Sequence, residues 1–454
     1  MKVINPFNDK VIDEITLLDK RQAFDSVDNA VKAKSKMRSL SSGDRSKILN
    51  QILIGIQNNF EAFVKTIVQE SGKPYRYAKG EVDRAIQTFT IAAEECKRLP
   101  HELFDIDASE KGRNLKGEVV YFPKGVVFGI SPFNFPLNLA VHKIAPAIAS
   151  GCPILLKPSS KTPLTMELLN KLIQSTDLPK GGFELIHCSR EVGDALIAHP
   201  EIDILSFTGS PDVGWSMKSK AGKKHTVLEL GGNAAAIVAH DADLKLAIDE
   251  LIVGGFAYSG QVCIHTQRIY VHESLMETFV TAFIARVEQL EIGDPMDPMT
   301  EFGVMIDEGN AKRIEEWVNE AIASGAECLV GGSRVGAFYA PTVLTNVSKG
   351  QKVRDEEVFG PVVMIAPFSS IDDAVAEVND CRWGLQASIF TDSIQIRNSV
   401  FKQLNVGSVI HNQSTTFRVD DMPYGGVKDS GFGREGVRYA MLDFLEPKLL
   451  VREG

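Results

Sequence analysis

The sequence predicts an α/β protein organised around a doubly wound parallel sheet. From residue 126 onward, short apolar runs typical of buried strands alternate with segments of helical periodicity, and polar segments follow three of those strands. Parallel strands joined through helices need right-handed crossovers, and sheets of this kind bind ligands at the carboxyl ends of their strands. A long helical region is predicted before this alternation begins.

The predicted elements follow one another in a regular order. Residues 20–100 are expected to be helical because apolar residues recur at helical spacing, as at Ile48, Ile52 and Ile56. A short strand at 117–122 ends in the Pro-Lys-Gly turn at 123–125. Strands are then predicted at 126–130, 153–157, 183–187 and 203–207, each followed by a helix. The second half begins with a strand near 227–230 and has helices near 242–252, 274–288, 309–324, 371–379 and 393–403.

Three polar segments come directly after predicted strands, at residues 131–134, 157–160 and 208–210. Ser210 has two interpretations: it is an ordinary helix N-cap, or it begins a helix whose free amides bind a pyrophosphate with help from the helix dipole. Lys157 and Ser160 are either solvated loop residues or side chains placed to contact ribose hydroxyls. Asn134 lies between prolines 132 and 136, which hold it in a stiff turn.

Residues 260–268 contain the strongest candidate for a reactive group. Cys263 follows a glycine-rich run at 253–260, and glycine lets a backbone take positive φ and approach a ligand closely. A small buried structural cysteine is the alternative. Glu229 stands among apolar neighbours at the end of a strand, where burial would raise the pKa of the carboxyl group and suit it to act as a general base. The alternative is a salt-bridged structural glutamate.

A formal dinucleotide-binding pattern, GxGxxG, occurs at residues 431–436. The chain ends too soon after Gly436 for the βαβ unit that gives this pattern its meaning. A turn and the start of a helix are predicted there instead, and no GxGxxG occurs in the predicted nucleotide-binding region.

Composition excludes several classes of protein. A chain of 454 residues with 44% hydrophobic and 24% charged residues is expected to form two large globular domains. Its net charge of -10 argues against nucleic acids and anionic membranes as partners. Six scattered cysteines without a CxxC pair predict reduced thiols in the cytoplasm, with neither disulfides nor a zinc site. The most apolar long stretch, 125–156, is interrupted by prolines and polar residues, so no membrane span is predicted.

Taken together, seven segments resemble the NAD(P)-dependent aldehyde dehydrogenase superfamily: residues 131–136, 157–159, 207–210, 229–232, 260–263, 357–361 and 423–426. They occur in the order typical of that family, and the spacing of Glu229 and Cys263 is similar too. The resemblance implies a Rossmann-type cofactor domain, an α/β catalytic domain and a small β oligomerisation arm. The expected boundaries are 1–104 and 124–228 for the NAD(P)-binding domain, 229–430 for the catalytic domain, and 105–123 with 431–454 for the arm and tail.

The resemblance also implies roles for individual residues. Cys263 would attack the aldehyde, and the Asn134 amide would form an oxyanion hole with the Cys263 backbone N–H, a stabilisation of about 3–4 kcal/mol per donor. Glu229 would activate water to hydrolyse the resulting thioester, directly or through a proton relay. No metal is required. The residues expected to contact the cofactor are Ile130, Ser131, Pro132, Phe133, Lys157, Ser160, Gly193, Ser210, Leu230, Glu357 and Phe359.

One departure from the family pattern concerns the cofactor. Many NAD-preferring members have a glutamate where this chain has Ser160, and that glutamate binds the adenosine ribose. Ser160 cannot repel a 2'-phosphate by charge, and Lys157 and Lys161 are nearby in the sequence. The cofactor is therefore expected to be NAD or NADP, with use of both left open.

Residues 157–161, 261–264 and 417–428 look most like the lactaldehyde and non-phosphorylating glyceraldehyde-3-phosphate dehydrogenase branch. The expected substrate is a small, hydroxylated or anionic aldehyde such as lactaldehyde or glyceraldehyde 3-phosphate. Arg418, in the loop 412–422, is predicted either to pair with a substrate anion or to hold loop carbonyls or Asp420. His265 is too close in sequence to Cys263 to activate it without a sharp turn, and Arg268 is expected to support the loop.

Two other functions are compatible with parts of the sequence. One is a cofactor-independent thioesterase or esterase that uses Cys263 and Glu229, and the other is a non-catalytic binding or structural protein. The presence of Asn134, Glu229, Cys263 and Glu357 together argues against the second. By resemblance, a strand at 118–122 and the segment 447–451 would form an arm that extends a neighbour's sheet, so a homodimer or homotetramer is expected.

Overall fold

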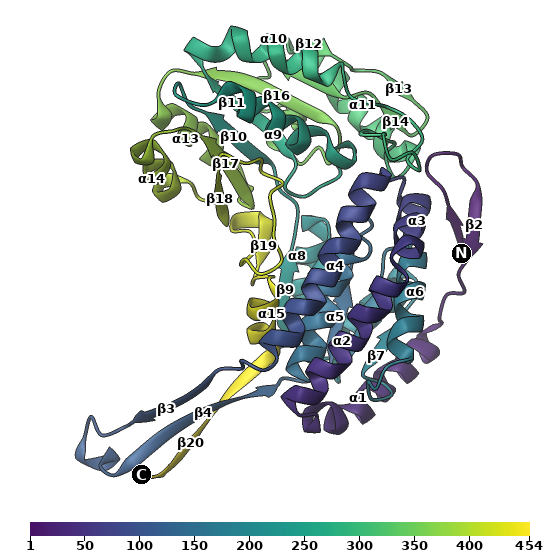
Figure 1. Cartoon of the computed structure of the whole chain (residues 1–454), viewed down its shortest axis with the longest axis vertical. Helices are drawn as coiled ribbons and strands as arrows, with labels where there is room; N and C mark the ends of the chain where they lie inside the picture. The colour runs from purple at the N-terminus through teal and green to yellow at the C-terminus, as the bar shows by residue number, and fades with distance from the viewer.

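The computed structural model describes all 454 residues and consists of two lobes with a long β arm (Figure 1). The chain begins with a hairpin of β1 (Lys2–Ile4) and β2 (Val11–Glu14). Four helices then form one side of the first lobe, as the apolar spacing predicted: α1 (Lys20–Ser39), α2 (Ser42–Asn58), α3 (Phe60–Ser71) and α4 (Tyr75–Glu95). The apolar faces of α2, α3 and α4 pack onto the helices that cover the first sheet.

The first sheet has the strand order β19-β9-β8-β5-β6-β7. The strands are β5 (Val127–Ile130), β6 (Ile154–Lys157), β7 (Phe183–Leu185), β8 (Ile204–Thr208), β9 (His225–Glu229) and β19 (Gly431–Phe432). All neighbouring pairs are parallel except β19 and β9. The chain proceeds from β5 through β6 to β7 and then crosses back to β8. The predicted doubly wound sheet is therefore present, with its topological switch point between β5 and β8.

Four helices connect these strands: α5 (Asn138–Ser150), α6 (Leu164–Gln174), α7 (Arg190–Ala198) and α8 (Pro211–Lys220). Every residue of α5 is buried, because it lies between the sheet and the helices α4 and α15 (Val437–Phe444). This explains why residues 138–150 are apolar nearly all round rather than along one stripe.

The second lobe contains a seven-stranded sheet with the order β12-β15-β16-β11-β10-β17-β18. Its strands are β10 (Ala234–Val238), β11 (Thr266–His272), β12 (Glu327–Val330), β15 (Thr342–Thr345), β16 (Val362–Phe368), β17 (Gln386–Phe390) and β18 (Ser408–His411), with a separate hairpin of β13 (Arg334–Val335) and β14 (Phe338–Tyr339). The helices are α9 (Leu244–Phe256), α10 (Met276–Val287), α11 (Glu308–Ala323), α12 (Lys352–Asp355), α13 (Ile371–Asn379) and α14 (Ile394–Gln403). Within the seven-stranded sheet, only β12 is antiparallel to its neighbour.

The arm is a three-stranded antiparallel sheet that extends away from both lobes (Figure 1). It consists of β3 (His101–Asp105), β4 (Leu115–Pro123) and β20 (Leu445–Glu453), with β4 in the middle. The two segments expected to form the arm, 118–122 and 447–451, pair with each other within it. Leu449, Leu450 and Val451 on β20 are about half exposed.

The chain beyond residue 430 differs from the sequence prediction in one respect. Residues 431–436 were predicted to form only a turn and a helix start, but Gly431 and Phe432 form the strand β19 on the edge of the first sheet. A strand this short has no periodicity to recognise. The helix α15 follows as expected and packs on α5, so residues 431–444 belong structurally to the first lobe and only β20 belongs to the arm.

Candidate active site

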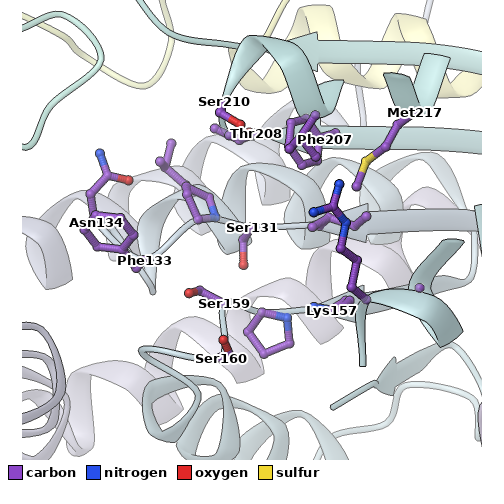
Figure 2. Close-up of a pocket in the computed structure, with 18 of the residues that line it drawn as sticks. Ser131, Phe133, Asn134, Lys157, Ser159, Ser160, Phe207, Thr208, Ser210 and Met217 are labelled. Atoms are coloured by element: carbon purple, nitrogen blue, oxygen red, sulfur yellow. The ribbon is translucent and has the colours of Figure 1, made fainter. Parts of the chain in front are cut away.

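A cavity of about 740 Å³ opens at the carboxyl ends of β5, β6, β8 and β9, where the second lobe faces the first sheet. Figure 2 shows Ser159 and Ser160 on one side of this cavity and Thr208 and Ser210 on the opposite side. All of the predicted catalytic and cofactor residues line it, namely Ile130, Ser131, Pro132, Phe133, Asn134, Lys157, Ser160, Gly193, Ser210, Glu229, Leu230, Cys263, Glu357 and Phe359. Arg418 is not among the lining residues.

The end of the cavity formed by β6 and α7 has an excess of positive charge. Lys157 and Arg190 line it and form no ion pair in the structure. The nearby Asp194 is paired with Lys220 at 3.0 Å. Lys161, which the sequence placed close to this site, instead pairs with Asp307 at 3.0 Å. Two cations therefore remain available to an anionic ligand.

Ser210 occupies the N-cap position of α8, but its side chain makes no capping hydrogen bond. Ser210 therefore does not cap α8 through its side chain. Pro211 has no N–H, and the next two amides, of Asp212 and Val213, stay free. On the side toward the second lobe, the Glu357 carboxylate accepts a hydrogen bond from the Gly232 amide at 3.0 Å. A Cβ on Gly231 would lie 2.1 Å from Glu357 Oε2, so a larger residue there would displace the Glu357 carboxylate.

Cys263 reaches the cavity because the backbone before it forms a left-handed turn. Tyr258, Ser259 and Gly260 have φ values of 49°, 53° and 67°. Two consecutive non-glycine residues in this region are strained, and each costs about 1–3 kcal/mol. The turn is held by hydrogen bonds from the Tyr258 hydroxyl to the Ser71 carbonyl (3.1 Å) and from the Ser259 hydroxyl to the Gly303 carbonyl (2.9 Å).

Gly260 is the one residue of this turn that must be glycine on steric grounds. A Cβ there would lie 2.2 Å from the Gly360 carbonyl oxygen. The following side chain, Gln261, is fully buried and accepts a hydrogen bond from the Ile306 amide at 2.9 Å. The turn therefore presents Cys263 from a backbone that is fixed on both sides.

Asn134 is hydrogen-bonded to the loop that carries Cys263. Its amide nitrogen donates to the Gln261 carbonyl at 2.9 Å, which leaves the second N–H of the amide free. The turn containing Asn134 leads into α5, whose first amides, at Leu137 and Asn138, donate to the buried Glu81 carboxylate. Glu81 in turn pairs with Lys73, which is also fully buried.

Lys73 connects the asparagine turn with the cysteine turn. Its ammonium group lies 3.8 Å from the centre of the Phe135 ring and 4.7 Å from the centre of the Tyr258 ring. A cation this far from water gains from both aromatic faces and from the Glu81 charge. One buried lysine thus holds the residues next to Asn134 and the strained turn before Cys263 in a fixed relation.

The Cys263 thiol is hydrogen-bonded to the Tyr424 hydroxyl, with 3.1 Å between Sγ and Oη. Burial raises the pKa of Cys263 to about 11, and the Glu357 and Glu229 carboxylates also raise it, against the Tyr424 hydrogen bond and the Arg418 charge, which lower it. Without ligands the group is therefore a protonated thiol at neutral pH. A nucleophile in this position needs stabilisation of its thiolate form.

Both carboxyl oxygens of Glu229 are buried without a hydrogen-bond partner. Burial, together with the nearby Glu435 charge, raises the pKa of Glu229 well above its usual value. Glu435 behaves in the opposite way: although burial opposes ionisation, the Lys143 and Arg418 charges lower the pKa of Glu435 to about 2. Of these two neighbouring carboxyl groups, Glu435 holds the negative charge and Glu229 is the one free to exchange a proton.

Arg418 has a partner that the sequence did not suggest. Its Nη2 pairs with Glu435 Oε2 at 3.0 Å, and its guanidinium carbon lies 3.7 Å from the centre of the Tyr424 ring. Asp420 is bound elsewhere, to Arg84 at 2.7 Å and to His142 Nε2 at 2.7 Å. Arg418 therefore does not hold Asp420, and its Nε is buried without a partner.

Of the two remaining residues near the cysteine, His265 supports the loop, whereas Arg268 makes no hydrogen bond to it. His265 Nε2 donates to the Gly255 carbonyl at 2.9 Å, and burial lowers the pKa of His265 to about 4. Its ring is thus neutral and directed at the backbone, so a Cys-His pair is not formed. Arg268 is fully buried in β11 and donates to the Asn233 carbonyl at 3.0 Å and the Glu377 carbonyl at 3.1 Å.

The matching family model, described as the aldehyde dehydrogenase family, covers residues 1–450. The chain belongs to the aldehyde dehydrogenase family. A relative named 3-sulfolactaldehyde dehydrogenase, from Priestia aryabhattai, is 40% identical over 99% of this chain and 94% of its own length. Among solved structures, aldehyde dehydrogenase 21 from Physcomitrella patens, in complex with the reaction product succinate, is 44% identical with a TM-score of 0.98, covering 100% of this chain and 95% of that one.

A second solved structure, glyceraldehyde-3-phosphate dehydrogenase GapN from Methanocaldococcus jannaschii complexed with NADP, is 37% identical with a TM-score of 0.95, covering 100% of this chain and 99% of that one. The family resemblance and the fold class predicted from the sequence are confirmed. The protein is an enzyme that oxidises an aldehyde to an acid, and its cofactor is NAD or NADP. None of its helices combines the length and hydropathy that a bilayer crossing requires.

The cavity of the dehydrogenase suits a dinucleotide. The unpaired Lys157 and Arg190 and the free amides of α8 are groups that bind phosphates. The glycines at 231 and 232 leave room beside Glu357, and the Phe133 and Phe359 rings meet edge to face with centroids 5.8 Å apart.

Sequence reasoning missed three residues that the structure brings to this site: Arg190, Tyr424 and Glu435. Arg190 lies in a fourth polar segment that follows a strand, β7. The same rule that selected the other three polar segments could have found it. Tyr424 stood in a recognised segment without a role, and Glu435 lay inside the rejected glycine pattern.

Proposed function

We propose that this dehydrogenase oxidises a small, hydroxylated or anionic aldehyde through a covalent thioester on Cys263. The observation that carries the proposal is the convergence of Cys263, Asn134 and Glu229 on one cavity from three different segments of the chain. A scaffold without catalysis has no need for a strained turn that presents a thiol next to a buried, unpaired carboxyl group.

In the first step, Cys263 loses its proton to water in the cavity, and Sγ forms a bond to the aldehyde carbon. The electron pair of the carbonyl π bond moves to oxygen and gives a thiohemiacetal. The free N–H of the Asn134 amide and the Cys263 backbone N–H are the donors we assign to that oxygen. NAD(P), when bound, would supply the acceptor for a hydride from the thiohemiacetal carbon, and loss of that hydride would leave a thioester on Cys263.

In the second step, Glu229 accepts a proton from a water molecule as its oxygen bonds to the acyl carbon. The C–S bond breaks, the carboxylic acid leaves, and the proton held by Glu229 passes to the Cys263 thiolate, which restores both groups. Because burial raises the pKa of Glu229, the ionised base becomes available only as the pH rises through that raised value. Hydrolysis of the thioester is therefore expected to accelerate with increasing pH.

The proposed reaction is tested by following reduced-cofactor absorbance with a panel of neutral and anionic aldehydes. We expect turnover with the wild-type enzyme and a loss of at least about 10³-fold in kcat for Cys263→Ala, because the other cysteine that lines the cavity, Cys188, lies beside Lys157 at the opposite end. Cys328→Ala, which alters a cysteine of the β12 edge strand, is the matched control and should keep full activity. Turnover that survives in Cys263→Ala would refute the covalent mechanism.

We infer that NADP is preferred over NAD, because Lys157 and Arg190 carry unpaired charges at one end of the cavity and Ser160 adds no negative charge there. Arg190→Ala is expected to raise the KM for NADP by about tenfold and to change the KM for NAD by less than about twofold, since a charge-assisted hydrogen bond to a phosphate is worth about 1.5–3 kcal/mol. Arg113→Ala, on the arm, is the control. Equal effects on both cofactors would contradict the assignment.

The substrate class is supported by the aldehydes named for the relatives and by Arg418. The guanidinium group has five N–H donors, and the structure uses only one of them, toward Glu435. The loop that carries Arg418 is held against α4 by Arg84, which binds both carboxylate oxygens of Asp420. An arginine with unused donors next to the cysteine site suits a carboxylate, sulfonate or phosphate on the aldehyde.

Arg418→Ala tests this role with two aldehydes of equal chain length, succinic semialdehyde and butanal. We expect kcat/KM to fall at least about tenfold further for the anionic substrate than for the neutral one. An equal fall for both would show that Arg418 only supports the loop and Glu435.

We also propose that the enzyme is a cytoplasmic homodimer or homotetramer assembled through its arm. The half-exposed apolar residues of β20 and its unpaired outer edge support this. A monomer mass by light scattering at micromolar concentration would contradict it. We propose further that residues 1–104 and 124–228 form the NAD(P)-binding domain and that the reactive cysteine belongs to a catalytic domain of residues 229–430.

A further inference from the structure

Tyr424 is the only residue whose side chain makes a hydrogen bond to the Cys263 sulfur, at 3.1 Å. Its ring is buried, with 2% of its surface exposed, among apolar neighbours that include Val262, Ile264 and Leu385. Neither the catalytic scheme above nor the family resemblance assigns this hydroxyl any task. A buried hydroxyl aimed at the reactive atom therefore needs an explanation.

The position of Tyr424 is fixed by a closed set of contacts. Its backbone exchanges two hydrogen bonds with the backbone of Glu435, at 3.0 and 2.6 Å. The Glu435 carboxylate pairs with Arg418, and the Arg418 guanidinium lies over the Tyr424 ring at 3.7 Å. Glu435 thus holds both the Tyr424 backbone and Arg418, and Arg418 holds the Tyr424 ring. The hydroxyl cannot turn away from the sulfur without breaking one of these contacts.

The phenol can only donate to an ionised Cys263. Burial raises the pKa of Tyr424 well above that of a free phenol, and a thiolate at Cys263 raises it further, so the hydroxyl keeps its proton throughout the working pH range. Other charged groups around the sulfur act in both directions: Glu229 and Glu357 disfavour the thiolate, and Arg418 favours it. Tyr424 and Arg418 are thus the side chains that favour the thiolate form of Cys263, whereas burial and the two carboxyl groups disfavour it.

We propose that Tyr424 is a further catalytic residue, whose hydroxyl donates a hydrogen bond to the Cys263 thiolate and so increases the fraction of nucleophile available to attack the aldehyde. This proposal rests on the assignment of Cys263 as the nucleophile. The proton that leaves the thiol still goes to water. The Tyr424 hydroxyl donates a hydrogen bond to the sulfur and does not act as a base. This hydrogen bond is released when Sγ bonds to carbon.

The test is the rate at which iodoacetamide, a neutral reagent, alkylates Cys263 as a function of pH, followed by mass spectrometry of the peptide that contains it. Tyr424→Phe keeps the ring under Arg418 and removes only the hydroxyl. Loss of one hydrogen bond to a charged group should raise the thiol pKa by about one unit or more. A higher thiol pKa lowers the thiolate fraction at pH 8, but the more basic thiolate is intrinsically more reactive and offsets part of this loss. The alkylation rate at pH 8 should therefore fall by about threefold to tenfold.

Tyr339→Phe is the matched control, because Tyr339 is equally buried and its hydroxyl has no hydrogen-bond partner. It should leave the pH profile unchanged. An unchanged or faster alkylation of Tyr424→Phe, at unchanged Tm and NADP affinity, would overturn the proposal. Turnover surviving in Cys263→Ala would instead overturn the proposed function, so the two failures are distinct.

If Tyr424→Phe does not fold, the wild-type enzyme labelled with 3-fluorotyrosine replaces it. The fluorinated phenol is a more acidic donor and should lower the thiol pKa, with a corresponding rise in the thiolate fraction at pH 8. A thiol pKa that does not fall in the labelled enzyme would contradict the proposal.

Discussion

The left-handed turn of Tyr258, Ser259 and Gly260 is the constraint on which the site depends. It places Cys263 in the cavity at the carboxyl ends of the first sheet's strands. Two of its residues are sterically strained, and only surrounding contacts can offset that strain. Those contacts come from the N-terminal helical region: the Ser71 carbonyl receives the Tyr258 hydroxyl, and the Lys73 ammonium lies over the Tyr258 ring. The helices before the sheet thus help to position the cysteine.

The same buried lysine extends this constraint to Asn134. Lys73 pairs with Glu81, and Glu81 binds the first amides of α5 directly after the asparagine turn. Removing one partner of a buried ion pair leaves an uncompensated charge, which is strongly destabilising. The relative position of the asparagine amide and the thiol is therefore coupled to the stability of the first lobe.

A second buried set of charges surrounds the proposed base. Lys143 and Arg418 keep Glu435 ionised, and the Glu435 charge then disfavours ionisation of Glu229. Gly425, next to Tyr424, has a φ of 156°, and a Cβ there would lie 2.9 Å from both Glu229 Oε1 and the Gly433 carbonyl oxygen. The segment 423–426 thus supplies both a donor to the sulfur and the space that Glu229 needs, which gives a physical reason for its Pro-Tyr-Gly-Gly sequence.

Much of this arrangement could be predicted from the sequence, because periodicity and strand-end polarity are local properties. The alternation after residue 126 correctly located the parallel strands of the first sheet and the edge at which their polar segments meet. The motifs predicted which residues gather at the cavity, while their chemical roles stay predictions.

Contacts between distant segments could not be predicted in this way. The partner of Arg418 was missed because Glu435 lies beyond a tight turn and a two-residue strand that has no periodicity. The contact of Tyr424 with Cys263 joins residues 161 positions apart and depends on how the two lobes meet.

The central claim is that oxidation proceeds through a thioester on Cys263 that Glu229 helps to hydrolyse. Its most direct test is mass spectrometry of Glu229→Gln, quenched in acid during reaction with succinic semialdehyde and NADP. The account predicts an acyl group on the peptide that contains Cys263, formed together with reduced cofactor and persisting longer than in the wild-type enzyme. Reduced cofactor without any adduct on Cys263, or an adduct on another residue, would contradict it.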